Sequence, residues 1–284
     1  MPFRDFEHRG RTIRCEIRTR ATPQEAWAAW TDPLKIASWF VDHAAGKAKE
    51  GEEVTWGWEK FAHGLTYRVL ASIPGEQFTL GFGKGVGSSE WAGRSGILDI
   101  RIQRDGDETV VRLVNSGFSE EAQWDEEYNG VDSGWRGALA LLRLYLDRYY
   151  GEPRSTFSVF RPADLSYPAV IECATQAGRL AQWLGQSSGI GHPGDAYQIR
   201  FFNGSTASGH VLERSEREVA LTWEEIRGTL TIGAFGDGPE KRTIKIAGCG
   251  WQLSREKARE IEATMSQAAG RLAALVASHA AALS

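Results

Sequence analysis

Aromatic side chains are the residues of this sequence best suited to forming a binding site. Tryptophan occurs 11 times in 284 residues, and eight of the 11 precede Gly151. Trp and Tyr each combine a large contact surface with one polar group, which suits them to pockets for small molecules. The distribution therefore predicts a ligand site in the first half of the chain.

The expected lining of this site follows from strand alternation and helix spacing. Every second side chain of a strand points to the same face, so Trp56 and Trp58 share a face. We predict a cavity lined by Trp56, Trp58, Tyr67, Phe82, Trp91, Asn115, Trp135 and Leu139. Core packing is the competing interpretation of each residue, because apolar stripes usually fill a core.

The run GFGKGVGSS has the glycine content of a phosphate-binding loop, whose backbone N–H groups can surround an anion. Its spacing does not fit, because Lys84 is not followed by Ser or Thr and the run leads into a strand instead of a helix. We therefore expect a loop between two strands, at the rim of the cavity.

The sequence has no pattern typical of a metal site or of a nucleophilic enzyme. The six histidines form no HExxH pair and have no metal-ligand spacing, so we predict no metal and no cofactor. No GxSxG motif is present, and Cys15 alternates onto an apolar face, where free cysteine usually acts as a small hydrophobic residue. We name no catalytic residue; for an enzyme, the nearest polar candidates are Tyr67, Asn115 and Arg143.

Composition limits the classes of partner. The net charge is −4 and no Lys/Arg cluster occurs on a candidate helix, which argues against a nucleic-acid partner. No apolar run reaches membrane-spanning length, and MPFRDFEHRG lacks the apolar segment of a signal peptide. Three widely spaced cysteines favour neither a disulfide framework nor a zinc knuckle. We expect a cytoplasmic protein.

The elements that must position the aromatic residues are an antiparallel sheet and a long helix. Thr22-Pro23-Gln24-Glu25 predicts a helix start, with a capping Thr, a Pro in the first turn and an acidic residue near the positive end. Short alternating runs then predict a meander with one apolar face. The helix from Gly134 to Tyr150 has a wide apolar stripe and would cover that face.

The second half of the chain repeats this order. With no gap, Thr22 aligns with Ser166 and Trp39 with Trp183, and small shifts align Leu80 with Leu221. A second long helix is predicted from Ser254 to about Ala282. The pattern indicates two copies of one domain.

The two copies differ in their aromatic residues. Those that become smaller or aliphatic in the second copy are Trp27, Trp30, Trp56, Trp58 and Trp135, which align with Ile171, Ala174, Ile199, Phe201 and about Ala268. The second copy also lacks the Gly-rich loop that carries Trp91. We therefore expect the first copy to keep a ligand-sized cavity and the second to be mainly a structural partner.

The segments ATPQEAWAAWTDPLKIASWF and GWRGALALLRLYL resemble the START-like (SRPBCC, birch-pollen-allergen-type) superfamily, in the branch of the C-terminal domain of the activator of the heat-shock-90 ATPase. The resemblance implies an α+β helix-grip fold, with a curved antiparallel sheet on a long C-terminal helix and two short helices after the first strand. It also implies a hollow that commonly binds hydrophobic small molecules. Some branches perform polyketide cyclisation or ring hydroxylation, but this one has no invariant catalytic motif.

We thus predict two tandem helix-grip domains, residues 1–152 and 153–284, packed as a pseudo-dimer. The predicted function is binding of a hydrophobic or aromatic small molecule in the first domain, without nucleic acid or membrane as partner. Two alternatives stay open. One is an enzyme of cyclase or hydrolase type using the same cavity, and the other is a chaperone-associated protein acting through its surface.

Overall fold

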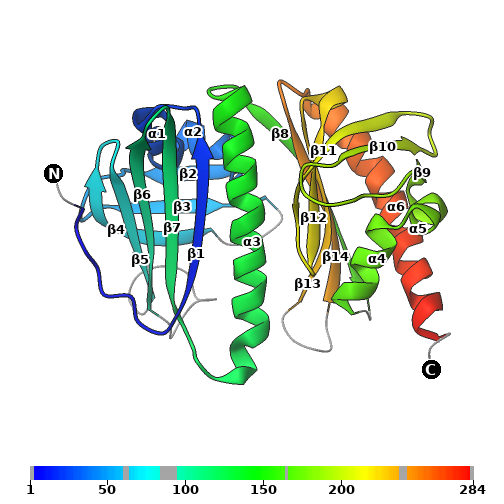
Figure 1. The fold of residues 1–284 in the computed structure, drawn as a ribbon, viewed down its shortest axis with the longest axis horizontal. Helices are drawn as coiled ribbons and strands as arrows, with labels where there is room; N and C mark the ends of the chain where they lie inside the picture. The colour runs from blue at the N-terminus through cyan, green and yellow to red at the C-terminus, as the bar shows by residue number, and fades with distance from the viewer. Residues whose placement is uncertain (1–2, 60–63, 84–94, 164–165, 237–241, 282–284) are drawn as a thin grey trace. The chain divides into compact units, whose positions relative to one another are not determined.

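The computed structural model describes residues 3–59, 64–83, 95–163, 166–236 and 242–281. Contacts between Cα atoms divide the chain into two compact units: residues 1–128 with 138–153, and residues 129–137 with 154–284. Each unit holds one seven-stranded antiparallel sheet (Figure 1). We expected a boundary between residues 152 and 153. The division by contacts lies one residue later and also assigns residues 129–137 to the second unit.

The first sheet has the strand order β1-β7-β6-β5-β4-β3-β2. After β1, two short helices lead to the meander of β2 to β7, and a long helix follows. The bounds are β1 Arg11–Thr19, α1 Pro23–Thr31, α2 Pro33–Ala37, β2 His43–Gly46, β3 Glu53–Gly57, β4 Leu65–Ile73, β5 Gln77–Phe82, β6 Gly96–Asp105, β7 Glu108–Phe118, a 3-10 turn Ala122–Trp124 and α3 Asp125–Leu144.

Local sequence explains the start of α1. Thr22 Oγ1 accepts a hydrogen bond from the Glu25 backbone N–H at 3.2 Å, and the Glu25 carboxylate accepts one from the Thr22 backbone N–H at 2.8 Å. This reciprocal capping box satisfies N–H groups that have no partner inside the helix. Asp32 caps α2 in a similar way, by accepting from the Leu34 N–H at 2.9 Å. The predicted helix start at Thr22 is confirmed.

The long helix differs from its predicted bounds. α3 begins at Asp125, not Gly134, and a π-helical turn at Tyr145–Tyr149 follows it. The earlier start has a physical reason, because Asp125, Glu126 and Glu127 place negative charge in the first turn, where the helix dipole favours it.

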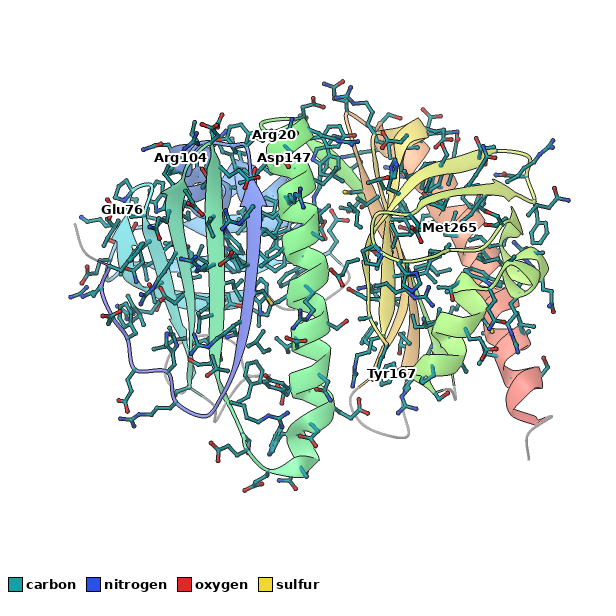
Figure 2. All side chains as sticks on the ribbon, in the orientation of Figure 1. Arg20, Glu76, Arg104, Asp147, Tyr167 and Met265 are labelled. Carbon is teal, nitrogen blue, oxygen red and sulfur yellow. The ribbon has the colours of Figure 1, made fainter. Side chains whose placement is uncertain are left out.

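Both ends of this helical segment are bound to β1. Near the start of α3, the Tyr128 hydroxyl donates to the Thr12 carbonyl at 3.2 Å. At the other end, the Asp147 carboxylate accepts from Thr19 Oγ1 at 2.6 Å and from the Arg20 N–H at 2.9 Å (Figure 2). These bonds hold the helix along the first strand.

The second sheet repeats the topology of the first, with the order β8-β14-β13-β12-β11-β10-β9. Its elements are β8 Arg154–Ala163, α4 Tyr167–Thr175, α5 Ala177–Trp183, β9 Gly185–Ser187, β10 Ala196–Phe201, β11 Thr206–Arg214, β12 Glu218–Trp223, a 3-10 turn Glu224–Ile226, β13 Gly228–Gly236, β14 Arg242–Trp251 and α6 Arg255–Ala281. The predicted α+β fold, two helix-grip domains in tandem, is confirmed.

Matching hydrogen bonds support the duplication. In the first repeat the Trp39 indole N–H donates to the Ala29 carbonyl at 2.9 Å, and in the second the Trp183 indole donates to the Cys173 carbonyl at the same distance. The capping role of Thr22 is taken by Ser166, whose side chain accepts from the Ala169 N–H. Each tryptophan therefore ties its two short helices together.

The core of the second unit lies between its sheet and α6. The helix packs against β8 and β14 and contributes the buried residues Ile261, Met265, Ala268 and Leu272. Ala268, which aligns with Trp135 of the first repeat, is 1% exposed and lies within this core. Within the described part of the chain, no helix is long and apolar enough to cross a membrane.

Candidate functional site

Strand register determines which side chains share the inner face of the first sheet. Leu80 pairs with Leu98, and Leu98 pairs with Asn115. Asn115 pairs in turn with Ile13, while Tyr67 pairs with Val54 on β3. Side chains directly opposite each other project to the same face, so Asn115 stands in a row of aliphatic residues.

An aromatic cluster occupies one end of this face. The ring of Trp56 lies 4.9 Å from that of Tyr67, and the rings of Tyr67 and Phe82 are 6.2 Å apart in a T-shaped arrangement. Trp58 packs edge-on against Phe40 at 5.3 Å and donates its indole N–H to the Phe40 carbonyl at 3.1 Å. The structure thus brings Trp56, Tyr67 and Phe82 into one cluster, as predicted.

The surroundings of Tyr67 differ from those of its neighbours. Trp56 is 2% exposed, whereas Tyr67 keeps part of its surface accessible. Burial nevertheless raises the pKa of the Tyr67 hydroxyl well above its usual 10.0, so the hydroxyl stays protonated at neutral pH.

The Tyr67 hydroxyl has no hydrogen-bond partner among the residues that the structure describes. Tyr197 in the second repeat shows the usual arrangement, since its hydroxyl donates to the Thr222 carbonyl at 2.5 Å. Among the described residues, Tyr67 thus lacks the hydrogen bond that Tyr197 makes.

The remaining predicted residues have different outcomes. Asn115 is 5% exposed and donates to the Ile97 carbonyl at 3.3 Å, and Leu139 is 1% exposed. Trp135 belongs to the segment grouped with the second unit, so its role in the first cavity stays a prediction. Trp91 and the Gly-rich loop from residue 84 onward lie outside the described residues.

Arg143, considered as a polar group for an enzyme, points away from such a site. Its side chain is 62% exposed and pairs with Asp147 at 3.6 Å, one helical turn away. This leaves Tyr67 and Asn115 as the polar groups proposed for the inner face. Both are uncharged hydrogen-bonding groups, which suits them to orienting a ligand.

The same register identifies their counterparts in the second repeat. Leu221 pairs with Leu230 and Leu230 with Gly248, so Gly248 takes the place of Asn115. A side chain there would overlap the Phe157 ring and a backbone carbonyl. Gly209, two residues before Val211, takes the place of Tyr67. The second repeat thus lacks both polar groups at these positions.

The second unit nevertheless has a pocket of about 400 Å³, which the sequence analysis did not predict. Phe201 and Trp223 line it together with Ile261 and Met265 of α6. By the repeat alignment, Phe201 and Trp223 are the counterparts of Trp58 and Phe82. These two aromatic matches could have indicated a pocket in the second repeat. The sequence prediction instead followed the loss of tryptophans from that repeat.

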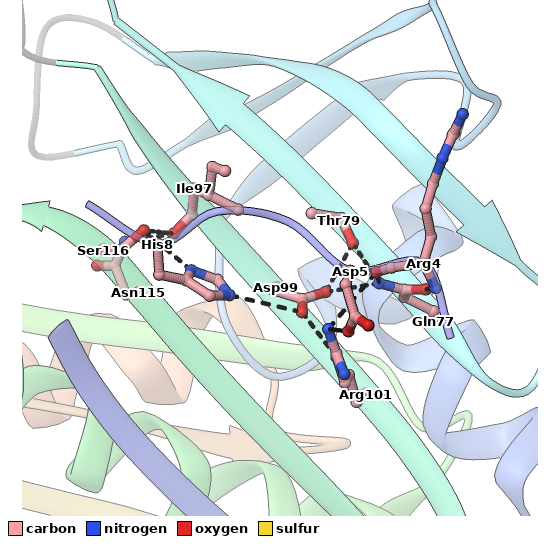
Figure 3. Close-up of polar contacts among 10 residues, drawn as sticks. All are labelled: Arg4, Asp5, His8, Gln77, Thr79, Ile97, Asp99, Arg101, Asn115 and Ser116. Carbon is pink, nitrogen blue, oxygen red and sulfur yellow. Dashed lines mark hydrogen bonds and ion pairs between the residues drawn. The ribbon is translucent and has the colours of Figure 1, made fainter. Parts of the chain in front are cut away.

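The outer face of the first sheet carries a buried polar cluster (Figure 3). Asp99 is fully buried and accepts from Thr79 Oγ1 at 2.6 Å, Gln77 Nε2 at 3.0 Å and Arg101 Nε at 2.8 Å. Gln77 also donates to the Arg4 carbonyl and accepts from the Arg4 N–H. The cluster therefore fastens the N-terminal segment, residues 3–9, across the sheet.

This cluster includes a serine, a histidine and an aspartate, but their geometry does not make a nucleophile. His8 Nδ1 lies 3.1 Å from Ser116 Oγ, whereas His8 Nε2 lies 4.0 Å from Asp99, beyond hydrogen-bond distance. Ser116 is 1% exposed, so no substrate carbonyl could reach its hydroxyl. We interpret the three residues as an anchor for the N-terminal segment.

Metal-ligating side chains do not gather anywhere in the described residues, where no group of three or more His, Cys, Asp or Glu could hold an ion. The three cysteines are free thiols, and Cys173 and Cys249 are buried. Burial raises the pKa of the Cys173 thiol, partly opposed by Arg179. A thiol in this state is a poor nucleophile at neutral pH.

Comparison with known protein families gave a match within the first repeat. Residues 20–147 match the model of the family described as activator of Hsp90 ATPase homolog 1-like protein. The matched range lies within the first repeat and is similar to that family. The resemblance predicted from the sequence is thereby confirmed for the first repeat, and the matched range contains the aromatic cluster and Tyr67. A search of curated proteins found no match.

Solved structures with a similar fold include single domains and two-domain chains. The di-domain ARO/CYC BexL from the BE-7585A biosynthetic pathway is 13% identical, with 94% of this chain and 98% of BexL covered and a TM-score of 0.43. DynU16 from the dynemicin biosynthetic locus is 18% identical, with 93% and 98% covered and a TM-score of 0.41. The Aha1 dimer from Colwellia psychrerythraea is 18% identical, with 49% and 98% covered and a TM-score of 0.42. These values are too low to carry an argument about function.

Proposed function

We propose that the first repeat binds a hydrophobic or aromatic small molecule between its sheet and its long helix. The ligand would lie against Trp56, Tyr67 and Phe82, with Asn115 further along the same face. The observation that carries this proposal is the Tyr67 side chain, which packs against Trp56 and Phe82 and whose hydroxyl has no hydrogen-bond partner among the described residues. A ligand with a hydrogen-bond acceptor would supply the missing partner.

Two further observations support this choice over simple core packing. The second repeat has glycine at the positions of Tyr67 and Asn115, so the fold does not require these side chains. Tyr197, its own inner-face tyrosine, is satisfied by a backbone carbonyl. A polar group that the fold does not need, set in an aromatic cluster as Tyr67 is, is a feature expected of a site that orients a ligand.

The same features favour binding over catalysis. The raised pKa of Tyr67 keeps its hydroxyl protonated, so it donates a hydrogen bond and does not act as a base at neutral pH. Asn115 has no ionisable group, and Arg143 lies on an exposed helix face. The proposed lining that the structure describes thus lacks the paired acid and base that a hydrolase or cyclase mechanism needs.

Titration of the full chain with 2-naphthol, followed by calorimetry, tests the proposal. Tyr67→Phe removes the free hydroxyl and should weaken binding by about 5- to 15-fold, the effect of one buried hydrogen bond of about 1–1.5 kcal/mol. Tyr197→Phe is the matched control. It removes a hydroxyl of the same type from the second repeat and should lower stability while leaving the affinity unchanged.

Two outcomes would count against a site at Tyr67. One is an affinity for 2-naphthol that is equal in the Tyr67→Phe variant and the parent chain. The other is a loss of affinity in Tyr197→Phe as large as that in Tyr67→Phe, which would assign the effect to general destabilisation.

A further inference from the structure

The pocket of the second unit lies between the first half of α6 and the ends of three strands. Its walls come from the end of β10, the start of β11, the end of β12 and the 3-10 turn that follows β12. Its volume of about 400 Å³ is within the range of small-molecule sites. All its lining residues belong to the second unit, so this pocket is separate from the site proposed at Tyr67.

The floor of the pocket is apolar and aromatic. The rings of Phe201 and Trp223 are tilted, with centroids 5.3 Å apart, and both residues are almost completely buried. The Trp223 indole N–H already donates to the Thr206 carbonyl at 3.1 Å. With that group satisfied, the indole contributes apolar ring surface to the lining, together with the aliphatic side chains of Ile261 and Met265.

The rim carries a carboxylate that the chain holds in place. The two oxygens of Glu225 accept hydrogen bonds from the Ser208 hydroxyl at 2.7 Å, the Ser208 N–H at 2.9 Å and the Thr206 hydroxyl at 3.3 Å. Burial alone would raise the pKa of Glu225, but these bonds outweigh it and lower the pKa below its usual value. Glu225 is therefore ionised at neutral pH.

The other charges of the rim largely cancel. Lys257 and Glu260 are neighbours on α6 and form an ion pair at 2.7 Å. With that pair neutral overall, Glu225 leaves the lining with one net negative charge. A fixed negative charge beside aromatic faces is the combination that attracts organic cations, through Coulomb attraction and cation–π contact.

We propose that the pocket of the second repeat binds a small organic cation, whose apolar or aromatic body lies against Phe201 and Trp223 and whose ammonium group lies near Glu225. This site and its ligand class are distinct from those proposed for the first repeat. The second repeat is then a binding domain in its own right, with a different charge preference.

A matched pair of probes tests the charge preference on the full chain. 1-Naphthylmethylamine is protonated at neutral pH, and 1-naphthalenemethanol has nearly the same shape without the charge. Calorimetry should show the amine binding about tenfold more tightly than the alcohol, the size of effect expected from one cation–π and carboxylate contact. Thr264→Trp, which fills the pocket from the rim, should abolish this tighter binding.

Variants that each remove one carboxylate show which residue causes the preference for the amine. Glu225→Gln should reduce the preference for the amine to about twofold or less, because the ammonium group loses its counter-charge. Glu224→Gln removes the same charge from the adjacent residue, which does not line the pocket, and should leave the preference unchanged.

Several results would overturn the proposal: equal affinity for amine and alcohol, no amine binding at millimolar concentration, or binding that survives Thr264→Trp. An equal loss of preference in Glu224→Gln and Glu225→Gln would also overturn it, because it would trace the effect to net charge instead of the pocket. Circular dichroism of each variant checks that the second unit stays folded.

Discussion

Replacing Asp99 with asparagine changes one atom of the buried cluster that holds the N-terminal segment. Thr79 and Gln77 both donate to Asp99 Oδ1, which an asparagine amide can retain as its carbonyl oxygen. Arg101 Nε donates to Oδ2 at 2.8 Å, and the substitution places an NH₂ group there. Two donors then face each other, and the buried charge is lost.

The cost can be bounded from this geometry. One charge-assisted hydrogen bond contributes about 1.5–3 kcal/mol, and breaking a buried ion pair costs about 3–5 kcal/mol. Asp99 is fully buried but the Arg101 side chain is 26% exposed, so water can partly solvate the guanidinium. We therefore expect Asp99→Asn to lower the free energy of unfolding of the first repeat by about 2–3 kcal/mol.

Urea denaturation followed by tryptophan fluorescence measures this cost, since eight of the 11 tryptophans precede Gly151. With a slope of about 2 kcal/mol per molar urea, the midpoint should fall by about 1–1.5 M. Asp105→Asn is the control on the same strand, because Asp105 pairs with Arg18 at the surface and is 58% exposed. Its midpoint should shift by less than about 0.5 M. Equal midpoints for the two variants would refute this account of Asp99.

Three further outcomes follow from the described contacts. Burial lowers the pKa of His8 below its usual 6.5, opposed by Asp99, so the unfolded chain binds the proton more readily and stability should fall as the pH drops below about 6.5. His8→Gln should flatten this part of a plot of urea midpoint against pH. Thr22→Ala removes the capping box at Glu25 and should cost about 1 kcal/mol in thermal unfolding, whereas Thr22→Ser should cost little. Gly248→Ala would overlap a carbonyl and an aromatic ring and should destabilise the second repeat by about 1–3 kcal/mol in urea titrations.

The fold could be predicted because local signals and the repeat agreed with each other. The Thr22 cap, the alternating strand residues and the paired tryptophans Trp39 and Trp183 each gave the same answer in both halves. The start of α3 was misplaced because its first turns are polar, and hydrophobic periodicity cannot detect a helix where the apolar stripe is interrupted.

The candidate sites were predicted only in part. Alternation correctly put Trp56, Tyr67 and Phe82 on one face, but whether a hydroxyl has a partner depends on contacts between distant strands. The outer-face cluster at Asp99 was missed for the same reason, since its members come from three separate segments of the chain. The pocket at Trp223 was missed because residue size was compared without considering the shape of the space between residues.

The measurement that tests the central claim most directly is an NMR map of bound 2-naphthol on the full chain. We predict nuclear Overhauser effects from the ligand to the side chains of Tyr67, Trp56 and Phe82, all in the first repeat. Effects confined to Phe201 and Trp223 would show that the second repeat holds the site for neutral aromatic molecules. That result would contradict the function proposed for the first repeat.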